Sequence, residues 1–177
     1  EHPRRDTTMD RLASLPVLHP EIDGFSITAG NSSGTNDAAA AVTLVDRDYA
    51  DSERLDVLAT VKAWAAVGVP PRDTGLGAVK VIGKVLQRAG LSATDVALWE
   101  INEAFASVPI AACREYGLDE ERVNFSGSGC SLGHPIAATG ARMVATLVYE
   151  LQRRGGGIGV AAMCAGGGQG GAVVVEV

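Results

Sequence analysis

The sequence has few aromatic residues and no excess of positive charge. The first shortage limits how the core can be packed, and the second limits the kind of partner that the protein can bind. Only 5% of its 177 residues are aromatic, whereas 46% are hydrophobic and 22 are glycine. Small apolar side chains and glycine must therefore fill the core, which favours a closely packed α/β fold. The net charge of −6 disfavours nucleic acid or an anionic membrane surface as a partner.

Cysteine is also scarce, and its spacing excludes several kinds of site. Cys113, Cys130 and Cys164 form no CxxC pair and no Cys/His cluster with zinc spacing, so we expect no metal. Cys113 and Cys130 are expected to serve packing. Free thiols are typical of a reducing compartment, and a cytoplasmic location is predicted. No signal peptide is visible, and no apolar run is long enough to span a membrane.

From residue 54 onward the hydrophobic pattern predicts alternating strands and helices. Strands are expected at 55–69, 96–102, 123–125, 158–163 and 172–177, and helices at 77–89, 104–116 and 139–154. The first run is mostly apolar and is interpreted as a long buried strand, with a helix as the alternative. This β-α-β-α-β-α-β-β order predicts a mixed sheet covered by helices. The last two strands are joined by a glycine turn and should be antiparallel neighbours.

The residues before this region carry too little apolar surface for a core of their own. Residues 1–24 are interpreted as an arm with one short amphipathic piece at 8–15. The sequence Asp6-Thr7-Thr8 would cap this piece as a helix. Short strands are expected at 25–28 and 41–45. The charged stretch 46–54 is expected to contain a helical turn, and we place the main boundary there.

Three side chains with useful chemistry each follow a predicted strand. Asn102 ends the strand at 96–102, His134 comes after 123–125, and Cys164 comes after 158–163. Because ligands bind at strand ends in open α/β sheets, an amide, an imidazole and a thiol are expected on one rim. Each residue also has a purely structural interpretation. Asn102 could be the N-cap of the following helix, and His134 could be a hydrogen-bonded histidine in a glycine-rich turn. Cys164 could be a small core residue.

Four motifs, taken together and in this order, resemble the thiolase family (acetyl-CoA C-acetyltransferase or 3-ketoacyl-CoA thiolase). They are TAGNSSGTND at 28–37, NEAF at 102–105, GHP at 133–135 and CAGGG at 164–168. The resemblance covers essentially the whole chain and corresponds to the C-terminal half of a thiolase. It implies a layered thiolase fold in three parts. These are a tail of the loop domain at 1–24, the last segment of the N-terminal half at 25–53 and the C-terminal domain at 54–177.

The resemblance also implies a function and the roles of individual residues. Thiolases form or cleave a 3-ketoacyl-CoA by thioester Claisen chemistry, with coenzyme A and acyl-CoA as substrates and no prosthetic group. By position, His134 would activate a nucleophilic thiol and Cys164 would be the acid/base thiol. Asn102 would hold a water that, with His134, stabilises the enolate oxygen.

Three further positions match residues of the family that contact the substrate. The main-chain N–H of Gly166 would join a second oxyanion hole, which serves the acyl-enzyme step. Ser33 would contact the pantetheine arm of coenzyme A, and Phe105 would line the same tunnel.

The nucleophilic cysteine of the family belongs to the N-terminal half, and neither Cys113 nor Cys130 falls at its position. We therefore expect an N-terminal thiolase half as a partner, either a separate subunit or a cleavage product. The isolated chain would then be inactive, and a homo- or hetero-oligomer is expected. Glu1 in place of an initial Met fits a truncated, processed or split protein. The alternative is a non-catalytic acyl-CoA-binding or scaffold subunit with relict thiolase motifs.

Overall fold

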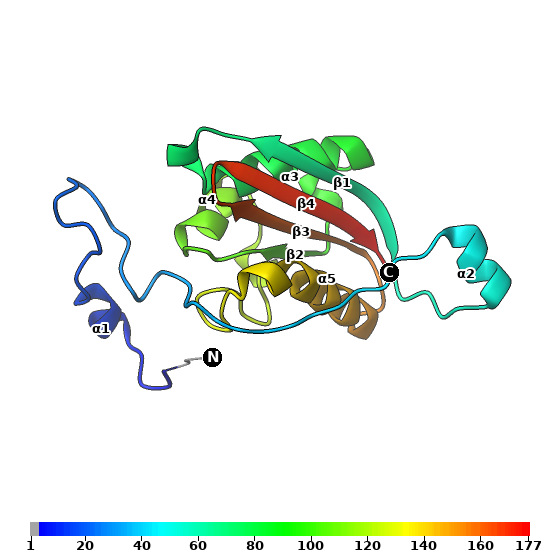
Figure 1. Cartoon of the computed structure of the whole chain (residues 1–177), viewed down its shortest axis with the longest axis horizontal. Coiled ribbons are helices and arrows are strands. Elements are labelled where there is room, and N and C mark those ends of the chain that lie inside the picture. The colour runs from blue at the N-terminus through cyan, green and yellow to red at the C-terminus, as the bar shows by residue number, and fades with distance from the viewer. Residues whose placement is uncertain (1–3) are drawn as a thin grey trace.

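The computed structural model describes residues 4–177, and its centre is a four-stranded mixed sheet (Figure 1). The strands are β1 (Thr60–Gly68), β2 (Leu98–Ile101), β3 (Ile158–Ala165) and β4 (Gln169–Glu176). Their order in the sheet is β1-β4-β3-β2, with β2 and β3 parallel and the other two pairs antiparallel. The predicted α/β class and the antiparallel pairing of the last two strands are confirmed.

Helices cover both faces of this sheet. Helices α3 (Leu76–Ala89) and α4 (Ser107–Tyr116) lie on one face, and α5 (Ile136–Arg153) lies on the other. Alternate residues of β2 therefore enter different cores. Trp99 and Ile101 pack on the α3 face, whereas Leu98 packs on the α5 face with Met143. Short 3₁₀ turns at Pro71–Asp73, Ala93–Asp95 and Glu120–Arg122 connect these elements.

The strand predicted at 123–125 is wrong, because a side chain takes over the pairing that a strand would make. Only an isolated bridge joins Val123 to Trp99. Asn124 has a left-handed backbone, with φ of 51°. Its Oδ1 accepts from the Ile101 N–H and its Nδ2 donates to the Ile101 carbonyl, both at 2.8 Å. The amide of Asn124 thus replaces a backbone ladder at the edge of the sheet.

Three other predicted strands are wrong or displaced: two of these segments expose large apolar side chains, and the third forms only a single bridge. Residues 36–46 have no regular structure, and Leu44 is 75% exposed. β1 begins only at Thr60. One face of this strand packs on α3, whereas Trp64 on the other face is 66% exposed. The expected strand at 25–28 is reduced to one bridge between Val17 and Thr28.

The helix predictions need smaller corrections. The one expected at 104–116 begins at Ser107, and the one expected at 139–154 begins at Ile136. The short helix α1 (Met9–Ala13) is capped by Thr8 as predicted, and α2 (Arg47–Glu53) lies in the charged stretch. Figure 1 shows α1 and α2 at opposite ends of the molecule, away from the sheet. No helix within residues 4–177 is long and apolar enough to cross a membrane.

Candidate active site

Asn102 and His134 lie side by side where β2 ends. Asn102 is fully buried, and its Nδ2 is 3.3 Å from His134 Nε2. The other ring nitrogen, Nδ1, is 2.8 Å from Thr139 Oγ1. The Thr139 hydroxyl donates its own proton to the Pro135 carbonyl at 3.0 Å, so it accepts from Nδ1–H. This network assigns the ring proton to Nδ1 and leaves Nε2 as the basic nitrogen.

The N-cap interpretation of Asn102 is wrong. If Asn102 were the N-cap, α4 would begin directly after it. The helix begins at Ser107 instead, with Ala106 at the N-cap and no side-chain capping bond. The Asn102 amide is directed instead at the imidazole. Its Oδ1 is buried and has no hydrogen-bond partner among the residues that the structure describes. A buried amide oxygen of this kind is suited to accept a hydrogen bond from a water or a substrate.

The main chain of His134 is anchored from a distant part of the sequence. Its N–H donates to Asn36 Oδ1 at 3.1 Å, and a bridge joins it to Thr35. Gly133 has φ of 110°, and a Cβ there would come within 2.6 Å of Asn36 Oδ1. Glycine is therefore required before the histidine, and the 28–37 motif and the GHP motif form one unit.

The surroundings of His134 favour the neutral imidazole. Burial is the main cause that lowers the pKa of His134, and the positive charge of Arg142 lowers it further. A neutral ring with an available Nε2 can accept a proton from a thiol at neutral pH. The site therefore has the protonation state that a general base needs.

Cys164 and Gly166 lie at the end of the neighbouring strand. The Asn102 N–H donates to the Ala162 carbonyl at 3.0 Å, which places the two strand ends next to each other. Cys164 is 6% exposed and packs in the core on the α3 face, and burial raises its thiol pKa. Gly166 is in an exposed turn, where an added Cβ would meet nothing within 4 Å. Of the three predicted strand-end residues, Asn102 and His134 are in direct contact.

Ser33 and Phe105 belong to two segments that pair with each other. The Ser33 N–H donates to the Ala104 carbonyl at 3.0 Å, and a bridge joins Ser32 to Phe105. Phe105 is 41% exposed. The two residues predicted to contact coenzyme A are therefore close together, next to the NEAF turn.

Glu103 ties the loop before His134 to the end of β2, a role that the sequence analysis missed. Its Oε2 accepts from the Cys130 N–H at 3.1 Å and its Oε1 accepts from Asn124 Nδ2 at 3.4 Å. A Cβ on Gly129 would lie 2.2 Å from the Glu103 carbonyl oxygen. Burial, together with Glu103, raises the pKa of Cys130 to about 11, so this thiol stays protonated at neutral pH.

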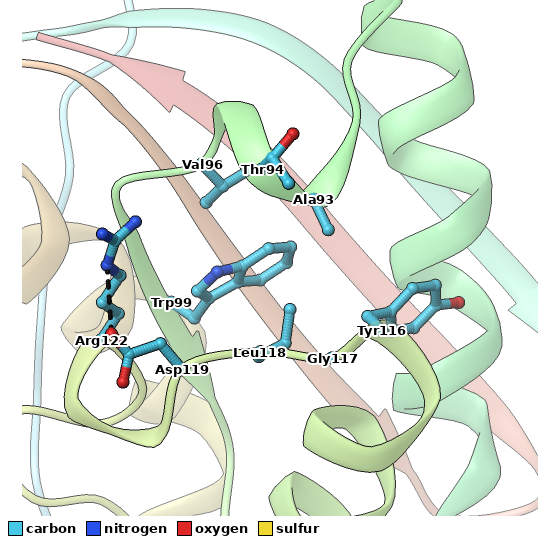
Figure 2. Close-up of a pocket in the computed structure, with 9 residues that line it drawn as sticks. All are labelled: Ala93, Thr94, Val96, Trp99, Tyr116, Gly117, Leu118, Asp119 and Arg122. Atoms are coloured by element: carbon cyan, nitrogen blue, oxygen red, sulfur yellow. Dashed lines mark ion pairs between the residues drawn. The ribbon is translucent and has the colours of Figure 1, made fainter.

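One pocket on the α3 face lies away from these residues. It has a volume of about 220 Å³ and surrounds the edge of the Trp99 indole, with Tyr116 and Leu118 beside it (Figure 2). An ion pair between Asp119 and Arg122, 3.5 Å long, lies at its side. None of the predicted site residues lines it. Within residues 4–177, no group of His, Cys, Asp and Glu is arranged to hold a metal ion.

Thr139 is the second residue that sequence reasoning missed, and its role can be tested in the chain itself. Thr139→Val would leave the Nδ1–H of the half-buried His134 without an acceptor, at an expected cost of about 1–3 kcal/mol of unfolding free energy. Thr139→Ser keeps the hydroxyl and should cost about 1 kcal/mol, for one lost methyl group. Urea unfolding measures both, and ¹⁵N shifts of the imidazole report which nitrogen carries the proton. Equal stability of the two variants, with Nδ1–H retained in both, would contradict this role.

These observations define a layered α/β domain with a polar site where parallel strands end. The family model of the thiolase C-terminal domain matches residues 55–177, and the chain belongs to the thiolase family. The 3-ketoacyl-CoA thiolase of Bacillus subtilis (strain 168) is 46% identical over 174 residues, which are 98% of this chain and 44% of that protein. The acetyl-CoA acetyltransferase of Escherichia coli (strain K12) is 43% identical over 177 residues, 99% of this chain and 44% of that protein.

Solved structures of thiolases are also similar to this chain over nearly its whole length. The crystal structure of the Bacillus anthracis acetyl-CoA acetyltransferase has a TM-score of 0.93 and 43% identity, covering 99% of this chain and 44% of that one. Human mitochondrial 3-ketoacyl-CoA thiolase in complex with CoA has a TM-score of 0.89 and 37% identity, with the same coverage. The chain thus spans less than half the length of the relatives it matches. These relatives include a cytosolic and a peroxisomal enzyme of Rattus norvegicus.

Proposed function

We propose that this chain supplies the histidine, the asparagine and the acid/base cysteine of a thiolase active site. A partner N-terminal half supplies the nucleophilic cysteine. The observation that carries the proposal is the contact between Asn102 and His134 Nε2, with the ring proton held on Nδ1 by Thr139. The substrates are coenzyme A and acyl-CoA thioesters, in line with the matched thiolases.

In the cleavage direction, His134 Nε2 removes the proton of the partner thiol. The thiolate attacks the 3-keto carbon, the C2–C3 bond breaks, and its electrons form the enolate of acetyl-CoA. The protonated imidazole and a water held by Asn102 stabilise the enolate oxygen. Cys164 then gives its proton to the enolate carbon, which releases acetyl-CoA.

The second half of the cycle returns both groups to their starting states. The Cys164 thiolate takes the proton of a coenzyme A thiol, and the new thiolate attacks the acyl thioester on the partner cysteine. The Gly166 N–H stabilises the oxyanion of that step. The partner thiolate leaves and recovers its proton from His134, and a shortened acyl-CoA is released. Burial raises the pKa of Cys164, which supports its role as a proton donor in the first half.

The partner half also accounts for the exposed apolar surface of this chain. Trp64 on β1 and Leu44 in the 36–46 segment are 66% and 75% exposed. Val42 and Val45 are exposed beside Leu44, and a run of exposed apolar side chains of this kind marks an interface in soluble proteins. We assign the segments 1–24 and 25–53 to the loop domain and the N-terminal half, and 54–177 to the C-terminal domain. An oligomer in the cytoplasm, with Ser33 and Phe105 along the pantetheine arm, completes the proposal.

The test uses a reconstituted complex, defined as this chain combined with an N-terminal thiolase half that carries the nucleophilic cysteine. Cys164→Ala should lower the rate of 3-ketoacyl-CoA thiolysis by about 10²–10⁴-fold, because the proposal gives the transfer of the α-carbon proton to this thiol. Cys113→Ala, which changes a partly buried thiol on α4, should keep the rate within about twofold. Equal rates in the two variants would favour the non-catalytic subunit with relict motifs.

A further inference from the structure

Glu103 follows Asn102 directly in the chain, and its hydrogen bonds have no part in the mechanism above. Both of its carboxylate oxygens accept hydrogen bonds from the loop that leads to His134. Oε2 accepts from the Cys130 N–H at 3.1 Å, and Oε1 accepts from Asn124 Nδ2 at 3.4 Å. One side chain thus connects the end of β2 to two points of that loop.

The main chain of Glu103 is tied to the same loop. Its N–H donates to the hydroxyl of Ser128 at 3.3 Å, and Ser128 is fully buried. Its carbonyl is in close contact with Gly129, where an added Cβ would come within 2.2 Å of the carbonyl oxygen. The Ser128 carbonyl also accepts from the N–H of Leu132 at 2.7 Å. The anchored part of the loop therefore reaches to within two residues of His134.

Asn102 lies between two residues that are both anchored to this loop. On one side, Ile101 exchanges two hydrogen bonds of 2.8 Å with the amide of Asn124. On the other side, Glu103 is held by its side chain and its main chain. The continuation of the loop carries His134. The position of the loop therefore sets the distance of 3.3 Å between Asn102 Nδ2 and His134 Nε2.

These contacts require a carboxylate at position 103. Asn124 Oδ1 already accepts from the Ile101 N–H, so Asn124 Nδ2 can only donate. The main-chain N–H of Cys130 is also a donor, so both oxygens of Glu103 face donors. A glutamine would present one oxygen and one NH₂ group, and one of the two contacts would then join a donor to a donor. A charged acceptor also makes stronger hydrogen bonds than a neutral one.

We propose that Glu103 is a positioning residue that holds the Asn102 amide and the His134 imidazole at their working distance. The inference rests on the proposed function, in which these two side chains act together on the enolate oxygen. Glu103 acts through the loop that it fastens and not on the substrate. A misplacement of about 1 Å at a catalytic group lowers a rate by up to about 10²-fold, so an anchor of this kind has a catalytic effect.

In the reconstituted complex, Glu103→Gln should lower kcat for thiolysis by about 10–10²-fold. KM should stay within about threefold, because the residues predicted to contact coenzyme A are unchanged. Gly129→Ala forces the same loop away from the Glu103 carbonyl and should show the same split between kcat and KM. The matched control is Glu115→Gln, which removes a carboxylate at an exposed position on α4 and should leave both constants within about twofold.

An NMR readout follows the contact itself in the 177-residue chain, without any need for thiolysis. The Nδ2 protons of Asn102 give the side-chain amide signals that are absent from Asn102→Ala, and their bond to the imidazole is lost in His134→Ala. Glu103→Gln and Gly129→Ala should move these signals toward their positions in His134→Ala. Glu115→Gln should leave them in place. An anchor that served stability alone would lower the free energy of unfolding, measured in urea, without moving these signals.

Moved amide signals together with a lower kcat support the proposal. Unmoved signals in a folded Glu103→Gln chain overturn it, and so does an unchanged kcat of that variant in an active complex. If Glu103→Gln does not fold, as judged by circular dichroism, Glu103→Asp decides by the same criteria, because it shortens the reach to the loop by one methylene group. An inactive parent complex would refute the proposed function, and the amide signals of the chain alone would still decide the positioning role.

Discussion

Replacing His134 by alanine is expected to lower 3-ketoacyl-CoA thiolysis in the reconstituted complex by about 10³-fold or more. The substitution removes the base that activates the nucleophile and one donor to the enolate oxygen, and each such loss is worth about 10²–10³-fold. Asn102 would also lose its only side-chain hydrogen-bond partner among residues 4–177. The effect should fall on kcat more than on KM, because both interactions strengthen in the transition state.

The matched control is His19→Ala. His19 is an exposed histidine that pairs with Glu21 in the arm before the first sheet strand. Its removal should leave the rate within about twofold, since surface substitutions far from a site have small effects. Steady-state rates of both variants, with circular dichroism to confirm folding, make the comparison. Full activity in His134→Ala would contradict the account, and so would a loss there with activity retained in Cys164→Ala.

The second large effect is on stability, and it concerns the contact between α3 and β4. A Cβ on Gly170 would lie 2.1 Å from the Gly77 carbonyl oxygen, and one on Gly77 would lie 2.4 Å from the Gln169 carbonyl oxygen. Two backbones touch here, so neither can give way without moving the helix off the sheet. Gly170→Ala is therefore expected to lower the free energy of unfolding by about 3 kcal/mol or more. Because Gly170 pairs with Cys164 in the sheet, activity should fall as well.

Gly171→Ala provides the control one residue further along the same strand. A Cβ there would meet nothing within 4 Å. Alanine also loses less backbone freedom on folding, so this variant should equal the parent or exceed it by up to about 1 kcal/mol. Urea or thermal unfolding followed by circular dichroism gives both values. Equal losses in the two variants would show that the close contact does not limit the fold.

Periodic features of the sequence predicted the parts of the fold that depend on local pattern. The apolar spacing of Val81, Ile82 and Val85 indicated a helix with one buried face, and all three side chains are fully buried. The helix predicted at 77–89 ends at Gly90, which adopts the left-handed conformation that a C-cap of this kind requires. Such features follow from residues within one or two turns of each other, which is why a single sequence shows them.

Other features depend on what lies nearby in space, and the sequence could not show them. Leu44 and Trp64 are as hydrophobic as core residues, but hydrophobicity does not say which surface covers a side chain. The amide of Asn124 forms two backbone bonds to Ile101, 23 positions away, where a strand was expected. One signal was available but not used: a hydroxyl residue five positions after His134, at the start of a predicted helix, is placed to hold its ring.

The most direct measurement is thiolysis of a 3-ketoacyl-CoA by this chain alone, by the cysteine-bearing N-terminal half alone, and by the two combined. We expect no activity in either part and, in the mixture, activity that rises to a plateau at a 1:1 ratio, because the base and the nucleophile come from different polypeptides. Replacing the nucleophilic cysteine of the N-terminal half should abolish that activity. Thiolysis by the 177-residue chain alone, or an inactive complex that forms at 1:1 with both parts folded, would contradict it.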